Sequence, residues 1–322
     1  MSSTVQTRSG FAAIIGAPNA GKSTLTNALV GEKVSIVTHK VQTTRFQIRA
    51  IAMLETRDGD PSQLVLIDTP GIFSPSEKDR LAKSMVHAAW TGAGDSQLVV
   101  HVIDAPAWLR HADGEGSAQD RLSVDDSKNV QAGLKNRKAR AFLVLNKVDE
   151  IPHDQLLPLI AEFSALEIYS EIFMTSAKNG EGMEQLSQAL AEAMPPGPYL
   201  YPEDQAADIP SRLMAAEITR EKLFLRLHDE LPYASMVETE RWKDLKSGDV
   251  RIEQVIYVRR ASQKPIVLGK NGRTIKDIGA AARKDMKDWL GRDVHLFLFV
   301  KVREKWSEDQ ARYSAMGLEF NV

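Results

Sequence analysis

The 322-residue chain contains no cysteine, so it has neither disulfides nor a thiolate metal site. A reducing compartment is therefore permitted. Long apolar runs are also missing: the stretch 98–102 is interrupted by His101 and is far shorter than the ~20 residues that cross a bilayer. The polar residues 1–8 do not resemble a signal peptide. We expect a soluble, cytoplasmic protein without a transmembrane segment, whose membrane contact, if any, is peripheral.

Charge is unevenly distributed, although the net charge is only −2. Residues 251–305 carry 14 Lys and Arg against six Asp and Glu, whereas residues 1–250 have a net charge of −8. A basic segment behind an acidic one is typical of a surface that meets a polyanion. A solvated charged face has the same composition, so charge alone leaves both readings open. The seven histidines show no metal-ligand spacing, and we interpret them as structural or surface residues.

The front of the chain alternates apolar, strand-like runs with helical stretches. The runs lie at residues 11–15, 48–54, 64–67, 98–103, 141–145 and 172–175, and the helical stretches include 23–29, 129–136 and 183–194. This alternation predicts an α/β fold with a mostly parallel sheet and helices on both faces. The run 48–54 is expected to pair with 64–67 through the polar turn 56–63.

Two segments interrupt the alternation. Residues 109–128 are charged and weakly periodic, which predicts a loop insertion. Residues 195–210 hold five of the 14 prolines, so neither helix nor strand suits them. They predict a boundary, giving a front domain over 1–195, a linker over 196–210 and a back domain over 211–322.

The back domain has a different order of elements. We expect a helix over 211–231, strands near 235–243 and 251–259, a short apolar segment at 265–268, a helix from 274 to about 290 and a last strand over 294–302. One face of the helix from 274 carries apolar residues at helical spacing, which are Ile275, Ile278, Ala282, Met286 and Leu290.

A glycine-rich loop follows the first predicted strand and opens the first helix. Its residues are Gly16, Ala17, Pro18, Asn19, Ala20, Gly21, Lys22 and Ser23, followed by Thr24. Small residues let backbone N–H groups wrap phosphate oxygens, and the helix N-terminus adds its positive dipole. Lys22 is then expected to reach the β- and γ-phosphates, and Ser23 to bind Mg²⁺. The sequence therefore predicts a phosphate site.

Three further strings follow buried strands in the expected order. Asp68 and Gly71 belong to the string Asp-Thr-Pro-Gly, in which the carboxylate is placed to hold Mg²⁺ through water and the glycine N–H to sense the γ-phosphate. The other two strings supply Asn146, Lys147, Asp149, Ser176, Ala177 and Lys178. A carboxylate such as that of Asp149 accepts two N–H bonds from guanine, which adenine does not offer. Together the strings predict a guanine nucleotide, GTP or GDP, and exclude an ATPase.

These motifs resemble those of the translation-factor-like class of GTPases. More narrowly, the loop 16–23, the string Gln42-Thr43-Thr44-Arg45 and the string 68–72 resemble the Era family of bacterial ribosome-assembly GTPases. The resemblance implies that residues 42–46 belong to switch I, and that Thr43 or Thr44 closes over Mg²⁺. We favour Thr44, so the expected metal ligands are Ser23, Thr44 and Asp68.

The route of hydrolysis is less evident. Ras-like enzymes orient water with a glutamine directly after the Asp-x-x-Gly string, where this chain has Ile72. Asn19 matches a loop asparagine with which related GTPases hold K⁺, and it is equally well explained as a turn residue. We expect slow turnover of GTP to GDP and phosphate, with Lys22, Asn19 and Thr44 as the catalytic candidates.

Gly269 and Gly272 bracket a short basic loop in the back domain. The spacing alone has little weight, but an apolar segment precedes it and an amphipathic helix follows. Glycines let phosphates approach and basic side chains neutralise them, which a clamp on single-stranded nucleic acid requires. The string 266–275 resembles a KH domain, and the element order resembles the type II arrangement. The predicted RNA-binding residues are Gly269, Lys270, Asn271, Gly272, Arg273 and Lys276.

The resemblance to the Era family covers residues 10–317. It implies binding to the 3′ end of small-subunit ribosomal RNA, action on the 30S subunit as a monomer, and peripheral association with the cell membrane. Because Ile72 replaces the usual glutamine, a non-catalytic GTP-sensing RNA scaffold is the alternative. A related double GTPase with a KH-like domain needs two complete phosphate loops, and this chain has one.

Overall fold

The computed structural model describes residues 6–38, 40, 43–77, 79–228, 231–304 and 306–322. The chain forms two compact units, each with its own sheet. Unit 1 comprises Met1–Ser35, Thr44–Asp208 and Ser314–Val322, and unit 2 comprises Ile36–Thr43 and Ile209–Tyr313. The domain limits at residues 195 and 210 stay predictions.

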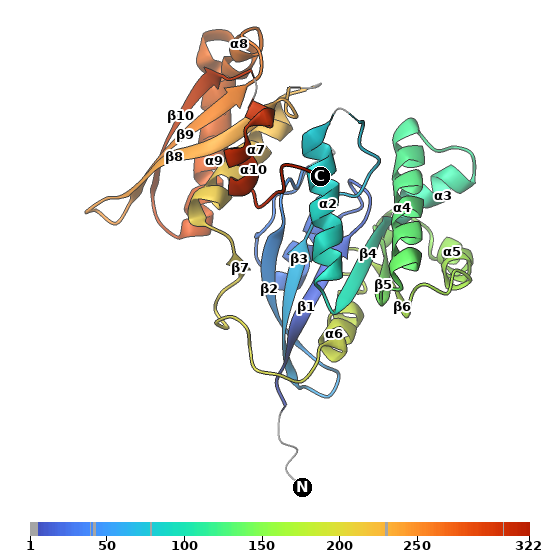
Figure 1. The fold of residues 1–322 in the computed structure, drawn as a ribbon. Helices are drawn as coiled ribbons and strands as arrows, with labels where there is room; N and C mark the ends of the chain where they lie inside the picture. The colour runs from blue at the N-terminus through green and yellow to red at the C-terminus, as the bar shows by residue number, and fades with distance from the viewer. Residues whose placement is uncertain (1–5, 39, 41–42, 78, 229–230, 305) are drawn as a thin grey trace. The chain divides into compact units, whose positions relative to one another are not determined.

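Unit 1 is built on a seven-stranded sheet in the order β6-β5-β4-β1-β3-β2-β7 (Figure 1). Its strands are β1 Arg8–Ile15, β2 Ile48–Glu55, β3 Pro61–Asp68, β4 Leu98–Asp104, β5 Ala141–Asn146, β6 Glu171–Thr175 and β7 Ala207–Asp208. β2 pairs antiparallel with β3 and with β7, as predicted for the hairpin, and the other neighbours are parallel. The predicted mostly parallel sheet is confirmed.

Helices cover both faces of this sheet, because the strands between them are apolar on both sides. They are α1 Lys22–Val30, α2 Arg80–Gly94, α3 Ala105–Ala112, α4 Ala118–Arg137, α5 Leu156–Ser164 and α6 Met183–Ala193, with 3₁₀ turns at Val148–Glu150 and His153–Gln155. Ala12 and Ile14 of β1 pack in the core shared with α1 and α6. Ala13 and Ile15, one residue on, pack in the core shared with α2 and α4. This alternation follows the two-residue period of a strand.

The prediction of a loop over residues 109–128 is wrong, because most of these residues are helical. α3 begins after Asp104, whose side chain accepts a 3.0 Å hydrogen bond from the N–H of Ala107. α4 begins with a complete capping box between Ser117 and Asp120. Few residues of α4 are buried, so its sequence has only weak apolar periodicity and the helix was not predicted. The capping box at its start is the sequence feature that indicates a helix here.

The proline-rich segment also departs from expectation at one point. Ala207 and Asp208 form β7, which pairs antiparallel with Arg49 and Ala50 of β2. Neither residue is a proline, so both can join the edge of the sheet. The prediction that no strand forms over 195–210 is wrong for these two residues.

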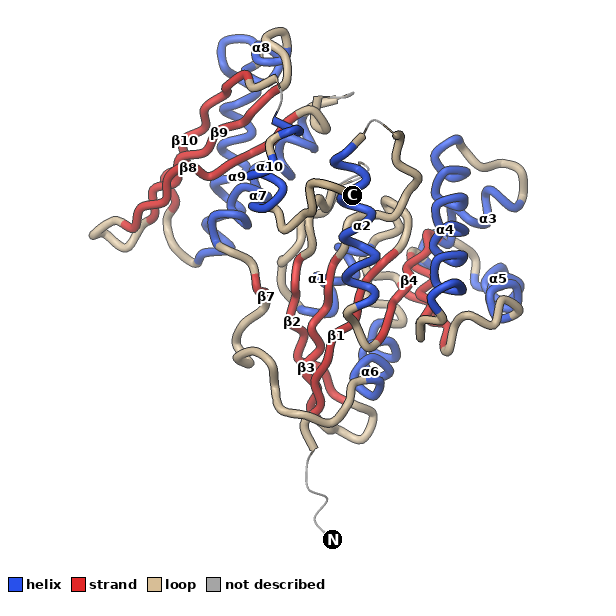
Figure 2. Tube along the Cα trace, viewed as in Figure 1, coloured by secondary structure: helices blue, strands red, loops and turns tan. Residues whose placement is uncertain are grey.

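Unit 2 has a three-stranded sheet in the order β10-β9-β8, with its helices packed on one face (Figure 2). Its elements are α7 Ser211–Arg226, β8 Ser235–Asp244, β9 Val250–Val258, α8 Gln263–Leu268, a 3₁₀ turn Lys270–Gly272, α9 Arg273–Leu290 and β10 Val294–Val302. The chain then forms a 3₁₀ turn Trp306–Glu308 and α10 Gln310–Ala315. The predicted order is confirmed. The first helix ends at Arg226 rather than residue 231, because Leu227 is extended.

Candidate functional site

The glycine-rich loop connects β1 to α1 at the edge where parallel strands of unit 1 end. Gly21 stands immediately before α1 with φ 98°, and a Cβ there would lie 2.1 Å from Asn146 Nδ2. Glycine is therefore required for both the backbone conformation and the close approach. The first N–H groups of α1 have no partner within the helix, so this end favours an anion.

Lys22 is a buried cation at the base of the loop. Its ammonium donates to the carbonyl oxygens of Gly16 at 3.1 Å and Ala17 at 2.8 Å. Burial lowers the pKa of Lys22 to about 8, although the carboxylates of Asp68 and Asp126 act in the opposite direction. An ammonium in this position is suited to meet the charge of a phosphate.

Two hydroxyl groups bond to the carboxylate of Asp68, and a third lies beside one of them. Ser23 Oγ donates to Asp68 Oδ2 at 2.8 Å and lies 2.9 Å from Thr44 Oγ1, while Ser35 Oγ donates to the same carboxylate oxygen at 2.7 Å. The structure thus brings the expected metal ligands together and adds Ser35, for which the sequence held no motif.

The donor set around Asp68 fits Mg²⁺. The other carboxylate oxygen, Asp68 Oδ1, is buried without a hydrogen-bond partner, and burial raises the pKa of this carboxyl group. The neighbouring ligands are hydroxyl oxygens, which suit a hard cation that keeps waters and binds phosphates. Within the described ranges, no cluster of three or more His, Cys, Asp or Glu offers an all-protein metal cage. Bound Mg²⁺ neutralises charge on the β- and γ-phosphates.

The guanine-specific strings meet around Asn146. Its Nδ2 donates to the carbonyl of Ala20 at 2.9 Å, and its Oδ1 accepts from the N–H of Ala177 at 3.1 Å. Lys147 has φ 67° and donates to Asp104 Oδ2 at 2.5 Å. The sequence analysis did not include Asp104 in the site. The sequence offered one indication of its role, namely that it is an acidic residue at the end of a buried strand, β4.

The remaining predicted residues of this region lie on nearby turns. Asp149 is exposed in the 3₁₀ turn Val148–Glu150, with its carboxylate open to a ligand. Ser176 is buried and its Oγ accepts from the N–H of Asn179, whereas Lys178 is exposed. Thr24 is half-buried in the first turn of α1.

The two threonines of switch I point to different partners. Thr44 is buried beside Ser23, whereas Thr43 Oγ1 donates to the carbonyl of Lys40 at 2.7 Å. Thr44 is thus the threonine that lies beside Ser23, and its role as a metal ligand stays a prediction. Gln42, which belongs to the predicted switch I, lies outside the described residues.

Ile72 contributes no polar side chain to the site. It is 3% exposed and packs in the core with Ala89 and Val130, while its N–H donates to the carbonyl of Gly16 at 3.0 Å. Asn19 has φ 64° at the turn of the phosphate loop. Water at the γ-phosphate therefore has no partner on the Ile72 side chain.

The glycine-bracketed loop of unit 2 connects α8 to α9. Gly269 has φ 73°, and a Cβ there would lie 2.1 Å from Thr274 Oγ1, so no other residue fits. Lys270, Asn271, Arg273 and Lys276 are exposed. In the described part of the chain, none of the three cations among them forms an ion pair, so their charges are available to a polyanion.

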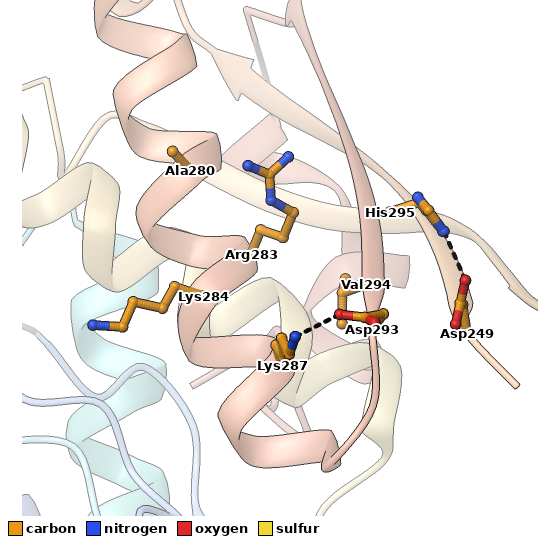
Figure 3. A pocket seen from close by; sticks show the side chains of 8 residues that line it. All are labelled: Asp249, Ala280, Arg283, Lys284, Lys287, Asp293, Val294 and His295. Atoms are coloured by element: carbon orange, nitrogen blue, oxygen red, sulfur yellow. Dashed lines mark hydrogen bonds and ion pairs between the residues drawn. The ribbon is translucent and has the colours of Figure 1, made fainter.

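A groove of about 480 Å³ lies further along α9, against β10 (Figure 3). Arg283, Lys284 and Lys287 line it from the helix. Lys287 pairs with Asp293 at 2.7 Å, and His295 lies 3.1 Å from Asp249, whose pKa it lowers. The other two cations form no ion pair with described residues, so the groove carries excess positive charge. The sequence analysis did not single out this groove, because its lining residues come from three separate segments, at Asp249, 280–287 and 293–295.

Comparison with known proteins assigns both units. A family model described as "50S ribosome-binding GTPase" matches residues 11–147, and a KH-domain model matches residues 230–307. The GTPase Era of Maricaulis maris is 56% identical over 98% of both chains. That of Caulobacter vibrioides is 51% identical over 99% of both, and that of Brucella suis is 54% identical over 98% of this chain and 94% of its own.

Solved structures agree with this assignment. A crystal structure of Aquifex aeolicus Era bound to GDP·AlF₄⁻ matches 96% of this chain and 99% of its own, with 33% identity and a TM-score of 0.84. An Era complex with MgGDPNP and nucleotides 1506–1542 of 16S ribosomal RNA matches 97% and 99%, with the same identity and TM-score. The prediction of a GTP-hydrolysing enzyme is confirmed, and the chain belongs to the Era family of GTPases.

Proposed function

We propose that this GTPase binds the 3′ end of small-subunit ribosomal RNA through unit 2, under the control of GTP or GDP in unit 1, and acts in assembly of the 30S subunit. The observation that carries the proposal is the basic loop 269–272, which opens a cation-bearing helix in a chain that also holds a guanine-nucleotide site. The solved Era complex with 16S ribosomal RNA supports it.

Different residues of unit 1 are assigned to the phosphates, the guanine base and the metal ion. We assign the phosphates to the backbone of residues 16–21 and to Lys22, and the guanine edge to Asp149. Ser23, Thr44 and Asp68 hold Mg²⁺, which is present in the solved Era complex. Phosphoryl transfer depends mainly on positioning and charge neutralisation, so these groups supply catalysis without a side-chain base.

The RNA backbone is held by the loop 269–272 and by Arg273 and Lys276. Gly269 gives the loop its shape, and Lys270 and the two helix cations neutralise phosphates. Beyond them, α9 presents the cations Arg283 and Lys284 in the groove with β10. The bound RNA can therefore continue from the loop along α9, toward the groove whose lining residues Figure 3 shows.

K⁺ is the proposed second cation, held by Asn19 at the phosphate loop. The support is that Ile72 lacks a polar side chain, so another positive group near the γ-phosphate would compensate. Turnover measured in K⁺ and in Na⁺ at equal ionic strength tests this. Faster turnover in K⁺ is expected, and equal rates would refute it.

Crosslinking and sequencing of bound RNA, in GTP and in GDP, tests the main proposal. Reads concentrated at the 3′ end of small-subunit ribosomal RNA and higher occupancy in GTP are expected. Random reads across transcripts would refute the ribosomal assignment, and equal occupancy would refute the switch. A Lys22→Ala protein that still supports assembly would favour the scaffold alternative.

No helix in the described portion is both long and apolar enough to span a bilayer. We also propose a monomer in the cytoplasm with peripheral contact at the inner membrane face, on the strength of the family resemblance alone. Light scattering and cell fractionation test these two points; a stable dimer or complete absence from the membrane fraction would contradict them.

A further inference from the structure

The outer face of the unit 2 sheet, opposite α7 and α9, carries two exposed aromatic rings. Phe297 and Phe299 of β10 are 42% and 50% exposed. The residues that alternate with them, Leu296, Leu298 and Val300, pack in the cores shared with the helices. Because successive side chains of a strand point to opposite faces, the two rings lie next to each other on the outer face.

The spacing of the two rings suits a single-stranded nucleic acid. Two residues along a strand advance by about 7 Å. Neighbouring bases of one strand in a duplex advance by only ~3.4 Å, because they stack on each other. The two rings can therefore each take one base of a strand whose bases are not stacked. Sheets that present aromatic residues to RNA in this way stack two or three bases.

Cations border the rings on the neighbouring strands. The guanidinium carbon of Arg251 lies 4.5 Å from the ring centroid of Phe297. Lys243 and Arg241 are exposed on β8, where they pair in register with Arg251 and Glu253 of β9. The Glu253 carboxylate lies 2.9 Å from Arg251 and 3.9 Å from Arg241. Three cations thus share one carboxylate, and positive charge is in excess beside the rings.

The aromatic rings are continuous with the groove between α9 and β10. His295, two residues before Phe297, is exposed and lines that groove together with Arg283 (Figure 3). At the other end of β10, Lys301 is paired with Glu240 at 2.9 Å. The excess of positive charge on the outer face therefore lies at the end nearest the groove. A polyanion that follows the groove meets the two rings directly beyond its edge.

We propose that the outer face of the unit 2 sheet is a second RNA-binding surface, on which Phe297 and Phe299 each stack one unpaired base. The bordering cations Arg241, Lys243 and Arg251 contact the phosphates between them. The ring spacing, the excess positive charge and the continuity with the cationic groove favour RNA over an apolar protein surface. The inference rests on RNA binding by unit 2 and adds a separate site to it.

The test measures the affinity of the full-length protein for an RNA corresponding to nucleotides 1506–1542 of 16S ribosomal RNA, the fragment in the solved Era complex. Phe297→Leu and Phe299→Leu keep an apolar side chain and remove the aromatic ring. Each should weaken binding by about fivefold or more, as the loss of one stacked base does, whereas Phe299→Trp should retain the affinity. Leu225→Ala removes an apolar side chain of α7 that is 49% exposed, and it is the matched control.

The salt dependence separates this surface from the loop 269–272. Stacking releases no counterions, so the slope of log K against log salt should be the same in the leucine variants as in the unmodified protein. Replacing Lys270 and Arg273 should instead flatten the slope. Leucine variants that bind as tightly as the Leu225 control would overturn the second surface, while a weakened loop variant would leave the proposed function standing. Absence of RNA binding by the unmodified protein would overturn both.

Binding to intact 30S subunits distinguishes RNA from a protein partner. The leucine variants should lose affinity for the subunit and for the RNA fragment alike. If they lose affinity for the subunit alone, the rings contact a ribosomal protein and the proposal is wrong. It is also wrong if the rings only mediate self-association, which light scattering detects.

Ultraviolet crosslinking of the unmodified protein to the RNA fragment gives a readout that needs no variant. The peptide that contains Phe297 and Phe299 should carry crosslinked nucleotides, and its complete absence from the crosslinked peptides would contradict the proposal. Circular dichroism checks that each variant is folded.

Discussion

The side-chain amide of Asn146 donates to the carbonyl oxygen of Ala20 at 2.9 Å, joining the end of β5 to the phosphate loop. The same amide accepts from the N–H of Ala177 at 3.1 Å. Asn146 is 2% exposed, so both bonds are shielded from water. One side chain therefore fixes the phosphate loop and the loop after β6 to each other.

Replacing Asn146 with alanine should weaken binding of GDP by about 10- to 100-fold. The substitution leaves the Ala20 carbonyl and the Ala177 N–H without their partner, at a cost of about 1–3 kcal/mol for each group that stays buried. Binding of GDP needs both loops in place, so we expect part of this cost, about 1.4–2.8 kcal/mol, to appear as lost binding free energy. Calorimetric titration with GDP measures the change, and Asn136→Ala, on the exposed face of α4, is the control. Affinity equal to that of the unmodified protein would show that the two loops are held by other contacts.

Replacing both Lys270 and Arg273 with alanine should weaken RNA binding and reduce its salt dependence. Each phosphate contact to single-stranded nucleic acid contributes a slope of about −0.7 to log K against log salt, so losing two contacts should flatten the slope by about 1.4. The measurement is a filter-binding or anisotropy titration at several salt concentrations. Lys246→Ala, an exposed cation between β8 and β9, is the control. An unchanged slope would exclude the loop 269–272 from phosphate contact.

The residues that bind phosphate and guanine were accessible to sequence reasoning because each motif is contiguous and follows a buried strand. The loop 16–23 and the string at Asn146 can therefore be recognised from the residues within and directly before them. Ser35 and Asp104 were not accessible, because each acts through a partner far away in the chain, Asp68 and Lys147 respectively. Only the pairing of strands and helices brings those partners together.

The helices α3 and α4 illustrate a different limit. Apolar periodicity predicts a helix only when a broad face is buried, and α4 buries little beyond Val124, Val130 and Leu134. Its stability depends instead on local devices such as the capping box at Ser117, together with the ion pair of Arg110 with Asp120 at 2.7 Å. The helix α4 can be predicted from its capping residues when these are given more weight than apolar periodicity.

Acid should destabilise unit 1 partly through His101. This residue is fully buried in β4, and burial, followed by the charge of Lys22, lowers its pKa from 6.5 to about 3. Because the folded pKa is depressed, only the unfolded chain takes up the proton between pH 6.5 and 3. The contribution of neutral His101 to the free energy of unfolding is thus complete above pH 6.5 and declines as the pH falls. At pH 5 it is lower by about 2 kcal/mol.

Chemical denaturation at pH 8 and pH 5 of the unmodified protein and of His101→Gln checks this. The stability advantage of the unmodified protein over the variant should shrink by about 2 kcal/mol at the lower pH. His228→Gln, in an exposed position, controls for the general loss of a histidine. An advantage that is the same at both pH values would contradict the argument.

The ion pair between Arg220 and Glu217 within α7 should be a major determinant of the stability of unit 2. Arg220 Nε donates to Glu217 Oε1 at 2.7 Å, and Nη2 donates both to the second carboxylate oxygen and to the backbone carbonyl of Thr43. The two side chains are 3% and 8% exposed. Arg220→Met leaves the Glu217 carboxylate buried without its cation, which costs about 3–5 kcal/mol.

A double-mutant cycle separates the lost pair from the stranded charge. Adding Glu217→Gln to Arg220→Met removes the unpaired carboxylate, so the double variant should recover part of the stability that the single variant loses. Urea unfolding followed by circular dichroism gives both values. If the double variant is no more stable than Arg220→Met, the penalty comes from packing and from the lost bond to Thr43. If the double variant is more stable than Arg220→Met, the penalty comes from the unpaired Glu217 carboxylate, which is the outcome that the burial of the pair predicts.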